Sequence, residues 1–362
     1  MKLIITILTS LIISSANGQN NMKTISEELI TTYIDRLNEI RDNPELLKNF
    51  EYNVEQPKHF ERNRINIALF NDFKSSDYQI AKYLFEQESL WRSSQNYYET
   101  GEVDNLYFSA FLVSIYNQAE MVIPFFQTKM IDFDSGIGFD GEFLLSNGKE
   151  ETYKYLNRSE NKIKSEIFKH IGASVSDCGY KDEDLQIWLN FKYKYFRNYI
   201  LPIDNEMWFL YSTREKSILD SNFEKWVKEH EDWNSDNIWK YVTFAKYLDK
   251  SDHHLIALEK QIELQNKPIE EQHWRHNELI KAYFEYNKPN ESLNLIESIL
   301  KVIEGKNRRR EYVEIMCDFI ISNKHIDTHE RILKLINIEI SEYGSFSKNV
   351  DDKLLIIKNR ND

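Results

Sequence analysis

Alternating carboxylates single out one stretch of the chain, Asp132-Phe133-Asp134-Ser135-Gly136-Ile137-Gly138-Phe139-Asp140. Carboxylate oxygens at such a spacing suit a hard cation such as Ca²⁺. An EF-hand loop, however, needs a glycine at its turn and a bidentate glutamate at its end, and this stretch has Ile137 and Phe143 at those two positions. We therefore predict a turn without metal, in which Asp140 caps the following helix. An enzyme with an acidic site around Asp132–Asp140 remains the second alternative for function.

Two pairs of histidines could each share one face of a helix, His273 with His276 and His325 with His329. Zinc requires a third and usually a fourth ligand, and no residue is suitably spaced to supply one. No serine lies in a nucleophile elbow, and no glycine-rich loop follows a strand. We predict no metal, no cofactor and no catalytic residue, and hence a protein that is not an enzyme.

The N-terminus has the pattern of a secretory signal peptide, which we predict over residues 1–18. Lys2 is followed by an apolar stretch from Leu3 to Ile13 and then by small residues up to Gly18. This stretch is too short to cross about 30 Å of hydrocarbon, and no later stretch is apolar for long enough. We therefore expect an exported protein, periplasmic or secreted, with no transmembrane segment after signal cleavage.

Composition favours an all-α fold. Glycine and proline number only 10 and 6 among 362 residues, whereas strand proteins need both residues for their many turns. The net charge of −13 disfavours nucleic-acid binding, which requires a basic footprint, and favours cationic partners. Export permits a disulfide between Cys178 and Cys317, but a chain of this size does not need one, and their pairing is left open.

Helical periodicity begins at Thr24–Arg41, and helical hairpins are expected over His59–Trp91 and Asp104–Met130. We interpret Pro202–Ser212 as a junction, with an extended segment at Met207–Tyr211. The chain is thereby divided into an N-terminal helical region, residues 19–201, and a repeat region, residues 202–362.

From Trp239 onwards the chain repeats with a spacing of 35 and then 36 residues. Large apolar residues recur on the first helix of each unit, and small residues recur on the second, where two helices must cross closely. The large residues are Phe244, Leu279 and Ile315, and the small ones are Ala257, Ser292 and Thr328. Such a period is typical of stacked helix-turn-helix units, which bury their apolar faces against their neighbours.

The pattern resembles tetratricopeptide-type repeats over residues 239–342. The resemblance implies helical hairpins stacked as an α-solenoid, tetratricopeptide-like in the C-terminal part of the chain. It is partial, because the small residue expected in the first helix is present as Ala245 but is replaced by Ile280 and Met316. The terminal proline of the consensus is also missing, so another kind of α-solenoid fits equally.

The resemblance also implies a partner-binding surface, since the first helices of such stacks line the concave face. Trp239, Trp274 and Arg310 are equivalent in the repeat register, as are Lys246 and Lys281. Tryptophan and arginine are enriched at binding hot spots. The alternative is that both tryptophans are core residues, because large aromatic side chains supply much buried area.

We therefore expect an exported, non-enzymatic scaffold that binds another protein through its helical-repeat surface. The first alternative is an immunity or inhibitor protein that binds a basic toxin, which the acidic charge favours.

Overall fold

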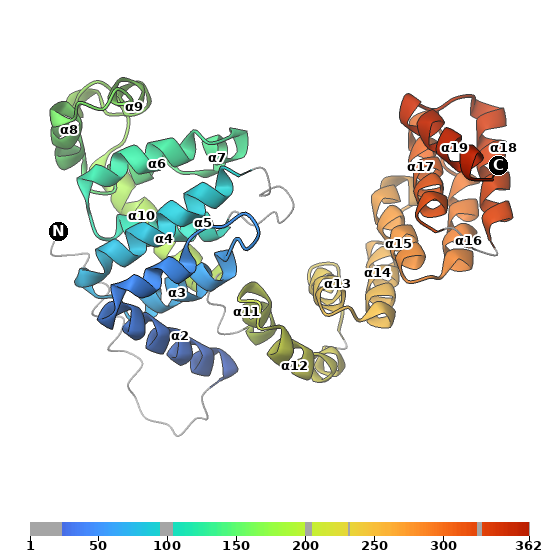
Figure 1. Ribbon diagram of the computed structural model, residues 1–362, viewed down its shortest axis with the longest axis horizontal. Coiled ribbons are helices and arrows are strands. Elements are labelled where there is room, and N and C mark those ends of the chain that lie inside the picture. The colour runs from blue at the N-terminus through green and yellow to red at the C-terminus, as the bar shows by residue number, and fades with distance from the viewer. Residues whose placement is uncertain (1–23, 95–103, 200–204, 231, 324–327, 362) are drawn as a thin grey trace. The chain divides into compact units, whose positions relative to one another are not determined.

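The structure, a computed structural model, describes residues 24–94, 104–199, 205–230, 232–323 and 328–361. Every regular element among these residues is a helix, which confirms the all-α prediction. The chain divides into two compact units, Met1–Leu219 and Asp220–Asp362, the second running from yellow to red in Figure 1. The predicted signal peptide and the predicted boundary between residues 201 and 202 both lie outside the described residues.

Unit 1 is built around an aromatic core. The ring centroid of Phe125 lies 5.2 Å from that of Phe85 and 5.6 Å from that of Phe143, within the range that aromatic pairs prefer. The elements around them are α2 (Ile25–Asp42), η2 (Pro44–Phe50), α3 (His59–Asn71), η3 (Ser75–Asp77), α4 (Tyr78–Arg92), α5 (Asp104–Ser114), η5 (Ala119–Met121), α6 (Val122–Lys129), α7 (Phe133–Gly138), η6 (Gly141–Leu145), α8 (Lys149–Arg158), α9 (Lys164–Ile171), η7 (Val175–Asp177), α10 (Asp182–Tyr199) and α11 (Glu206–Ser212).

The turn predicted at Asp132–Asp140 is wrong, because most of this stretch forms the short helix α7. Asp132 is its N-cap, and the Asp132 carboxylate accepts a hydrogen bond from the backbone N–H of Ser135 at 2.7 Å. Asp140 precedes η6, but its side chain makes no capping bond there. Its carboxylate instead accepts the indole N–H of Trp188 at 2.7 Å and lies 2.6 Å from the ammonium of Lys192.

The extended segment predicted at Met207–Tyr211 is also wrong, since these residues belong to α11. The Asn205 side chain caps this helix by accepting the backbone N–H of Trp208 at 3.2 Å. Glu206 then holds α11 against α2, because its carboxylate accepts the N–H of Ile25 at 2.7 Å. Local strand propensity is overridden here by a cap and a long-range contact.

Unit 2 consists of packed helix pairs (Figure 1). Its elements follow α12 (Lys216–Glu229), whose first residues belong to unit 1. They are α13 (Ile238–Tyr247), α14 (Ser251–Gln265), η8 (Ile269–Glu271), α15 (His273–Glu285), α16 (Pro289–Leu300), α17 (Lys306–Ser322), α18 (His329–Tyr343) and α19 (Lys348–Asn361). The three predicted hairpins are α13 with α14, α15 with α16, and α17 with α18, and each pair is in contact.

Polar contacts join each pair to the next at separations close to the repeat length. The ammonium of Lys288 at the start of α16 lies 3.1 Å from Asp252 of α14. Among the first helices, the side-chain amide of Asn277 donates to Glu311 at 2.9 Å, linking α15 to α17. Residues 34 to 36 positions apart are therefore neighbours in space.

The small residues of the second helices do not keep one structural position. Ala257 and Ser292 are buried within α14 and α16, whereas Thr328 is buried but precedes α18. On the first helices the register holds, because Ala245, Ile280 and Met316 are all fully buried. At the predicted position of the large apolar residues, Phe244 and Leu279 are buried but Ile315 is only partly buried.

Tight turns of one construction join α11 to α12, α13 to α14, and α15 to α16. Arg214, Asp249 and Asn287 each adopt a left-handed conformation, with φ of 57°, 57° and 56°. The next N–H in each turn donates to a carbonyl five residues back, at 2.9, 2.9 and 2.7 Å, as in a Schellman motif. The first of these turns lies before Trp239, outside the range in which the sequence repeat was recognised.

Candidate partner-binding surface

Both predicted surface tryptophans lie on the first helices of their pairs and are exposed. Trp239 in α13 is 39% exposed and Trp274 in α15 is 46% exposed, so neither is a core residue. The indole N–H of Trp239 donates to the carbonyl of Asp236 at 2.8 Å, which holds the ring in place. Tryptophan is enriched at binding hot spots, so these exposed rings are candidates for a partner-binding surface.

A cation lies against each of these rings. The ammonium of Lys240 is 5.7 Å from the ring centroid of Trp239, and the guanidinium of Arg275 is 4.1 Å from that of Trp274. Both distances are within the range of cation–π interactions. Lys240 and Arg275 are not among the residues predicted from sequence, although a Trp-Lys and a Trp-Arg dipeptide stand 35 residues apart.

Lys246 and Lys281 stand seven residues after the two tryptophans, on the same faces of α13 and α15. Both are exposed, and neither forms an ion pair with any residue that the structure describes. Burial, together with the charge of Lys246, lowers the pKa of His254 to about 4. We call the exposed faces of α13 and α15 that carry these residues, Trp239 with Lys246 and Trp274 with Lys281, the Trp–Lys face.

Arg310 does not share this arrangement. Its guanidinium lies 3.6 Å from Glu314 on the same helix and is partly buried. The position of α17 equivalent to Lys246 and Lys281 is Cys317, which is fully buried, and α19 packs against α17. The structure therefore places four of the five predicted residues on exposed faces of α13 and α15, while Arg310, whose side chain is 39% exposed, pairs with Glu314 on α17.

Both cysteines are free thiols, Cys178 partly exposed and Cys317 buried. Burial raises the pKa of Cys317 to about 12, so the side chain is a neutral thiol at physiological pH.

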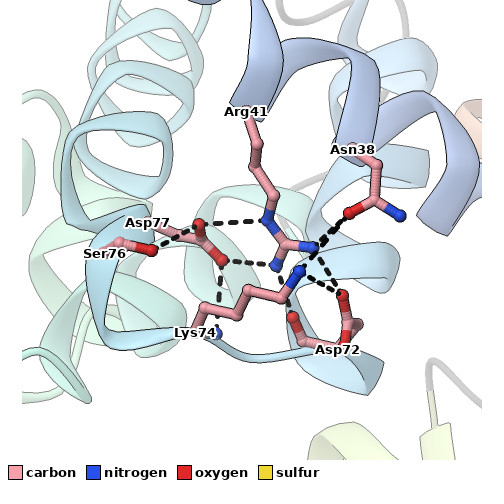
Figure 2. A network of polar contacts seen from close by, with 6 residues as sticks. All are labelled: Asn38, Arg41, Asp72, Lys74, Ser76 and Asp77. Atoms are coloured by element: carbon pink, nitrogen blue, oxygen red, sulfur yellow. Dashed lines mark hydrogen bonds and ion pairs between the residues drawn. The ribbon is translucent and has the colours of Figure 1, made fainter.

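In unit 1, an ion-pair network built on Arg41 joins α2 to the turn between α3 and α4 (Figure 2). The guanidinium donates to Asp77 at 3.1 and 2.5 Å, to the carboxylate of Asp72 at 2.5 Å and to Asn38 at 2.8 Å. Asp77 is 1% exposed and also accepts the backbone N–H of Lys74 at 3.2 Å. Because its groups are saturated by one another, we interpret this network as structural.

A second charged pair lies in the core of unit 1, where Arg62 of α3 contacts Glu88 of α4 and both side chains are completely buried. Arg62 also donates to the carbonyl of Phe50 at 3.1 Å. Burial raises the pKa of Glu88 above its ordinary value, against the opposing charge of Arg62. Near this pair, the side-chain amide of Asn105 in α5 donates a hydrogen bond to the carbonyl of His59 at 2.9 Å.

The acidic stretch at Asp132–Asp140 is engaged in bonds that hold unit 1 together. Asp132 accepts a hydrogen bond from Arg92 at 2.9 Å in addition to the Ser135 N–H. Although burial raises the pKa of Asp132, these hydrogen bonds lower it overall. Asp140 is held by Trp188 and Lys192, so Asp132 and Asp140 both anchor the fold, whereas the Asp134 side chain is 72% exposed.

The histidines do not form a metal site in the described part of the chain. Among the residues that the structure describes, no three histidine, cysteine or acidic side chains gather closely enough to hold an ion. His276 is buried, with its ring Nδ1 3.1 Å from the carbonyl of Gln272. His325 lies outside the described residues.

In comparisons with known proteins, the chain shows no significant match to a family model, to a curated protein or to a solved structure. No helix in the described part of the chain combines the length and the apolar character that crossing a bilayer requires.

Proposed function

We propose that this protein is an exported, non-enzymatic scaffold that binds another protein through the Trp–Lys face. The observation that carries the proposal is the exposure of Trp239 and Trp274, 39% and 46%, at equivalent positions of two successive first helices. Tryptophan is the side chain most strongly enriched at binding hot spots, and exposing two of them in register has no role in the core.

The packed helix pairs of unit 2 support this proposal, and we infer that they stack as a tetratricopeptide-like α-solenoid. Each pair cannot bury both faces alone and must stack on its neighbours, which leaves one long face of the first helices for ligands. The cross-pair bonds Lys288–Asp252 and Asn277–Glu311 are what such stacking produces. Export rests on the signal-peptide pattern of residues 1–18, and N-terminal sequencing of the secreted or periplasmic protein, expected to begin at Gln19, tests it.

The binding experiment uses the mature chain, immobilised and exposed to extract from the compartment in which it is found. The Trp239→Ala/Trp274→Ala variant should retain its helical circular dichroism but lose the specifically captured protein, by at least tenfold. Phe191→Ala is the matched control, because Phe191 is an exposed aromatic residue on unit 1, 59% exposed. Equal capture by the double variant and by the wild type would refute the proposed surface.

The first alternative, an inhibitor of a basic toxin, is favoured by the net charge of −13. It requires a single cationic partner whose binding is tight and weakens strongly with salt. Purification of the captured protein and measurement of its isoelectric point distinguish the two functions.

A further inference from the structure

We propose that the segment recognised by the Trp–Lys face is an acidic peptide segment that also bears large apolar side chains. This inference rests on the proposed function and adds the chemical class of the partner. The net charge of the chain alone would favour a basic partner, but the distribution of charge over the helices of unit 2 favours an acidic one.

Two α-helices of unit 2 carry charged residues of one sign only, the first helix α13 and the second helix α16. α13 contains two basic residues, Lys240 and Lys246, and no acidic residue. α16 contains two acidic residues, Glu291 and Glu297, and no basic residue. α14 likewise has three acidic residues against the single Lys260. In a chain with a net charge of −13, the helix that presents Trp239 is therefore a local positive patch.

α15 continues the patch less strongly. Its Arg275 and Lys281 are balanced by Glu278 and Glu285, so the helix has no net charge, and the exposed Glu278 lies one turn after Trp274. However, Arg275 lies directly on the ring of Trp274, and Lys281 has no ion-pair partner in the described part of the chain. The cations closest to the two rings thus remain available to a ligand, while the ion pairs of α14 and α16 serve the stacking of the pairs.

Each tryptophan thereby presents an apolar ring with a cation beside it. A carboxylate of the ligand would pair with Lys240 or Arg275, and arginine can hold a carboxylate through two parallel hydrogen bonds. A neighbouring apolar side chain would cover the exposed part of the indole. A basic segment would instead meet like charge at both rings, and like-charge juxtaposition at an interface is strongly unfavourable.

The test measures fluorescence anisotropy with the full mature chain and two fluorescein-labelled 12-residue peptides. In the first, Glu alternates with Leu and Phe, and in the second, Lys replaces every Glu. We expect the Glu peptide to bind at least tenfold more tightly than the Lys peptide, and to weaken as salt is raised from 50 to 200 mM, because screened charges contribute less.

The charge-reversal variant Lys246→Glu/Lys281→Glu should lower the affinity for the Glu peptide at least tenfold. Lys348→Glu/Lys358→Glu on α19 makes the same change in net charge at exposed residues away from the face and should leave the affinity within twofold. Tighter binding of the Lys peptide, equal binding of both peptides, or equal effects of the two variants would each overturn the inference.

The Trp239→Ala/Trp274→Ala variant separates this inference from the proposed function. If the Lys peptide binds more tightly and its binding needs both tryptophans, the face is a binding surface and only the assignment of an acidic ligand fails. If neither peptide nor any captured protein depends on the tryptophans, the proposed function fails as well.

Discussion

The buried Arg62–Glu88 pair allows a sharp test of how unit 1 is stabilised. In Glu88→Gln the side chain keeps its shape and its capacity to hydrogen-bond, but the guanidinium of Arg62 loses its counter-charge in a fully buried setting. Two unit charges about 4 Å apart interact by about 4 kcal/mol at an effective dielectric constant of about 20. The bond from Arg62 to the carbonyl of Phe50 remains and offsets only part of this loss.

Removing one partner of a buried pair costs about 3–5 kcal/mol, because the remaining charge is left uncompensated. We expect the loss of unfolding free energy to lie at the lower end of this range for Glu88→Gln and at the upper end for Glu88→Ala. Since whole domains are stable by only about 5–15 kcal/mol, either variant should bring unit 1 near its unfolding threshold. The double variant Arg62→Met/Glu88→Leu should recover most of the loss, because it buries no charge.

Urea unfolding followed by circular dichroism measures the free energy of unfolding, and hydrogen exchange of the α3 and α4 amides assigns the change to unit 1. Glu45→Gln is the matched control, because Glu45 forms an exposed ion pair with Lys48, and it should leave unfolding unchanged within error. A loss below about 1 kcal/mol for Glu88→Gln, or a double variant less stable than either single one, would refute the reasoning.

Three further predictions concern stability. Burial lowers the pKa of His254 to about 4, so the unfolded state binds the extra proton at a higher pH than the folded state does. Up to about 3 kcal/mol of stability should therefore be lost as the pH falls from about 6.5 to 4. Urea titrations at each pH measure this loss, and His254→Gln should abolish it. Gly172→Ala should destabilise by about 2 kcal/mol, because its φ is +102° and a Cβ would meet the Asp177 carbonyl, whereas Gly179→Ala, with open space around it, should be neutral in thermal unfolding. Asp77→Ala should cost about 2–4 kcal/mol by depriving a largely buried guanidinium of two hydrogen bonds, and hydrogen exchange should show α2 loosening first.

The helical character of the fold was predictable because it depends on local pattern. The capping box of Thr24 and Glu27, both halves of which form, marks the start of α2 in sequence as well as in structure. The predicted hairpins of unit 2 follow from apolar residues at helical spacing, and Ala245, Ile280 and Met316 are buried as such spacing requires.

The two errors in secondary structure arise where a distant residue decides the local conformation. Gly138 was interpreted as part of a turn, but it ends a helix and is small because a Cβ would collide with the hydroxyl of Tyr107. The aromatic run at Met207–Tyr211 has strand propensity, yet the contact of Glu206 with the start of α2 favours a helix. Neither contact can be seen from the residues nearby.

The candidate site could be located in sequence but its exposure could not. A tryptophan seven residues before a lysine on an amphipathic helix fits a core face and a binding face equally well. The 35-residue repeat places Trp239 and Trp274 at equivalent positions, but only the packed neighbours show that both rings remain 39% and 46% exposed. The buried Arg62–Glu88 pair was not predicted at all, because 26 residues of sequence separate its two charges.

The extent of the Trp–Lys face follows from the same reasoning about neighbours. The repeat register assigns Arg310 and Cys317 of α17 to the positions of the tryptophans and lysines on α13 and α15. α19 packs against α17 and Cys317 is fully buried, so the position of the lysines is closed on the third first helix, although the Arg310 side chain remains 39% exposed. Residues at equivalent repeat positions project from the same side of their helices, but the neighbouring helix determines whether a ligand can reach them. A partner should therefore contact α13 and α15, and Arg310→Ala should weaken its binding less than either tryptophan substitution.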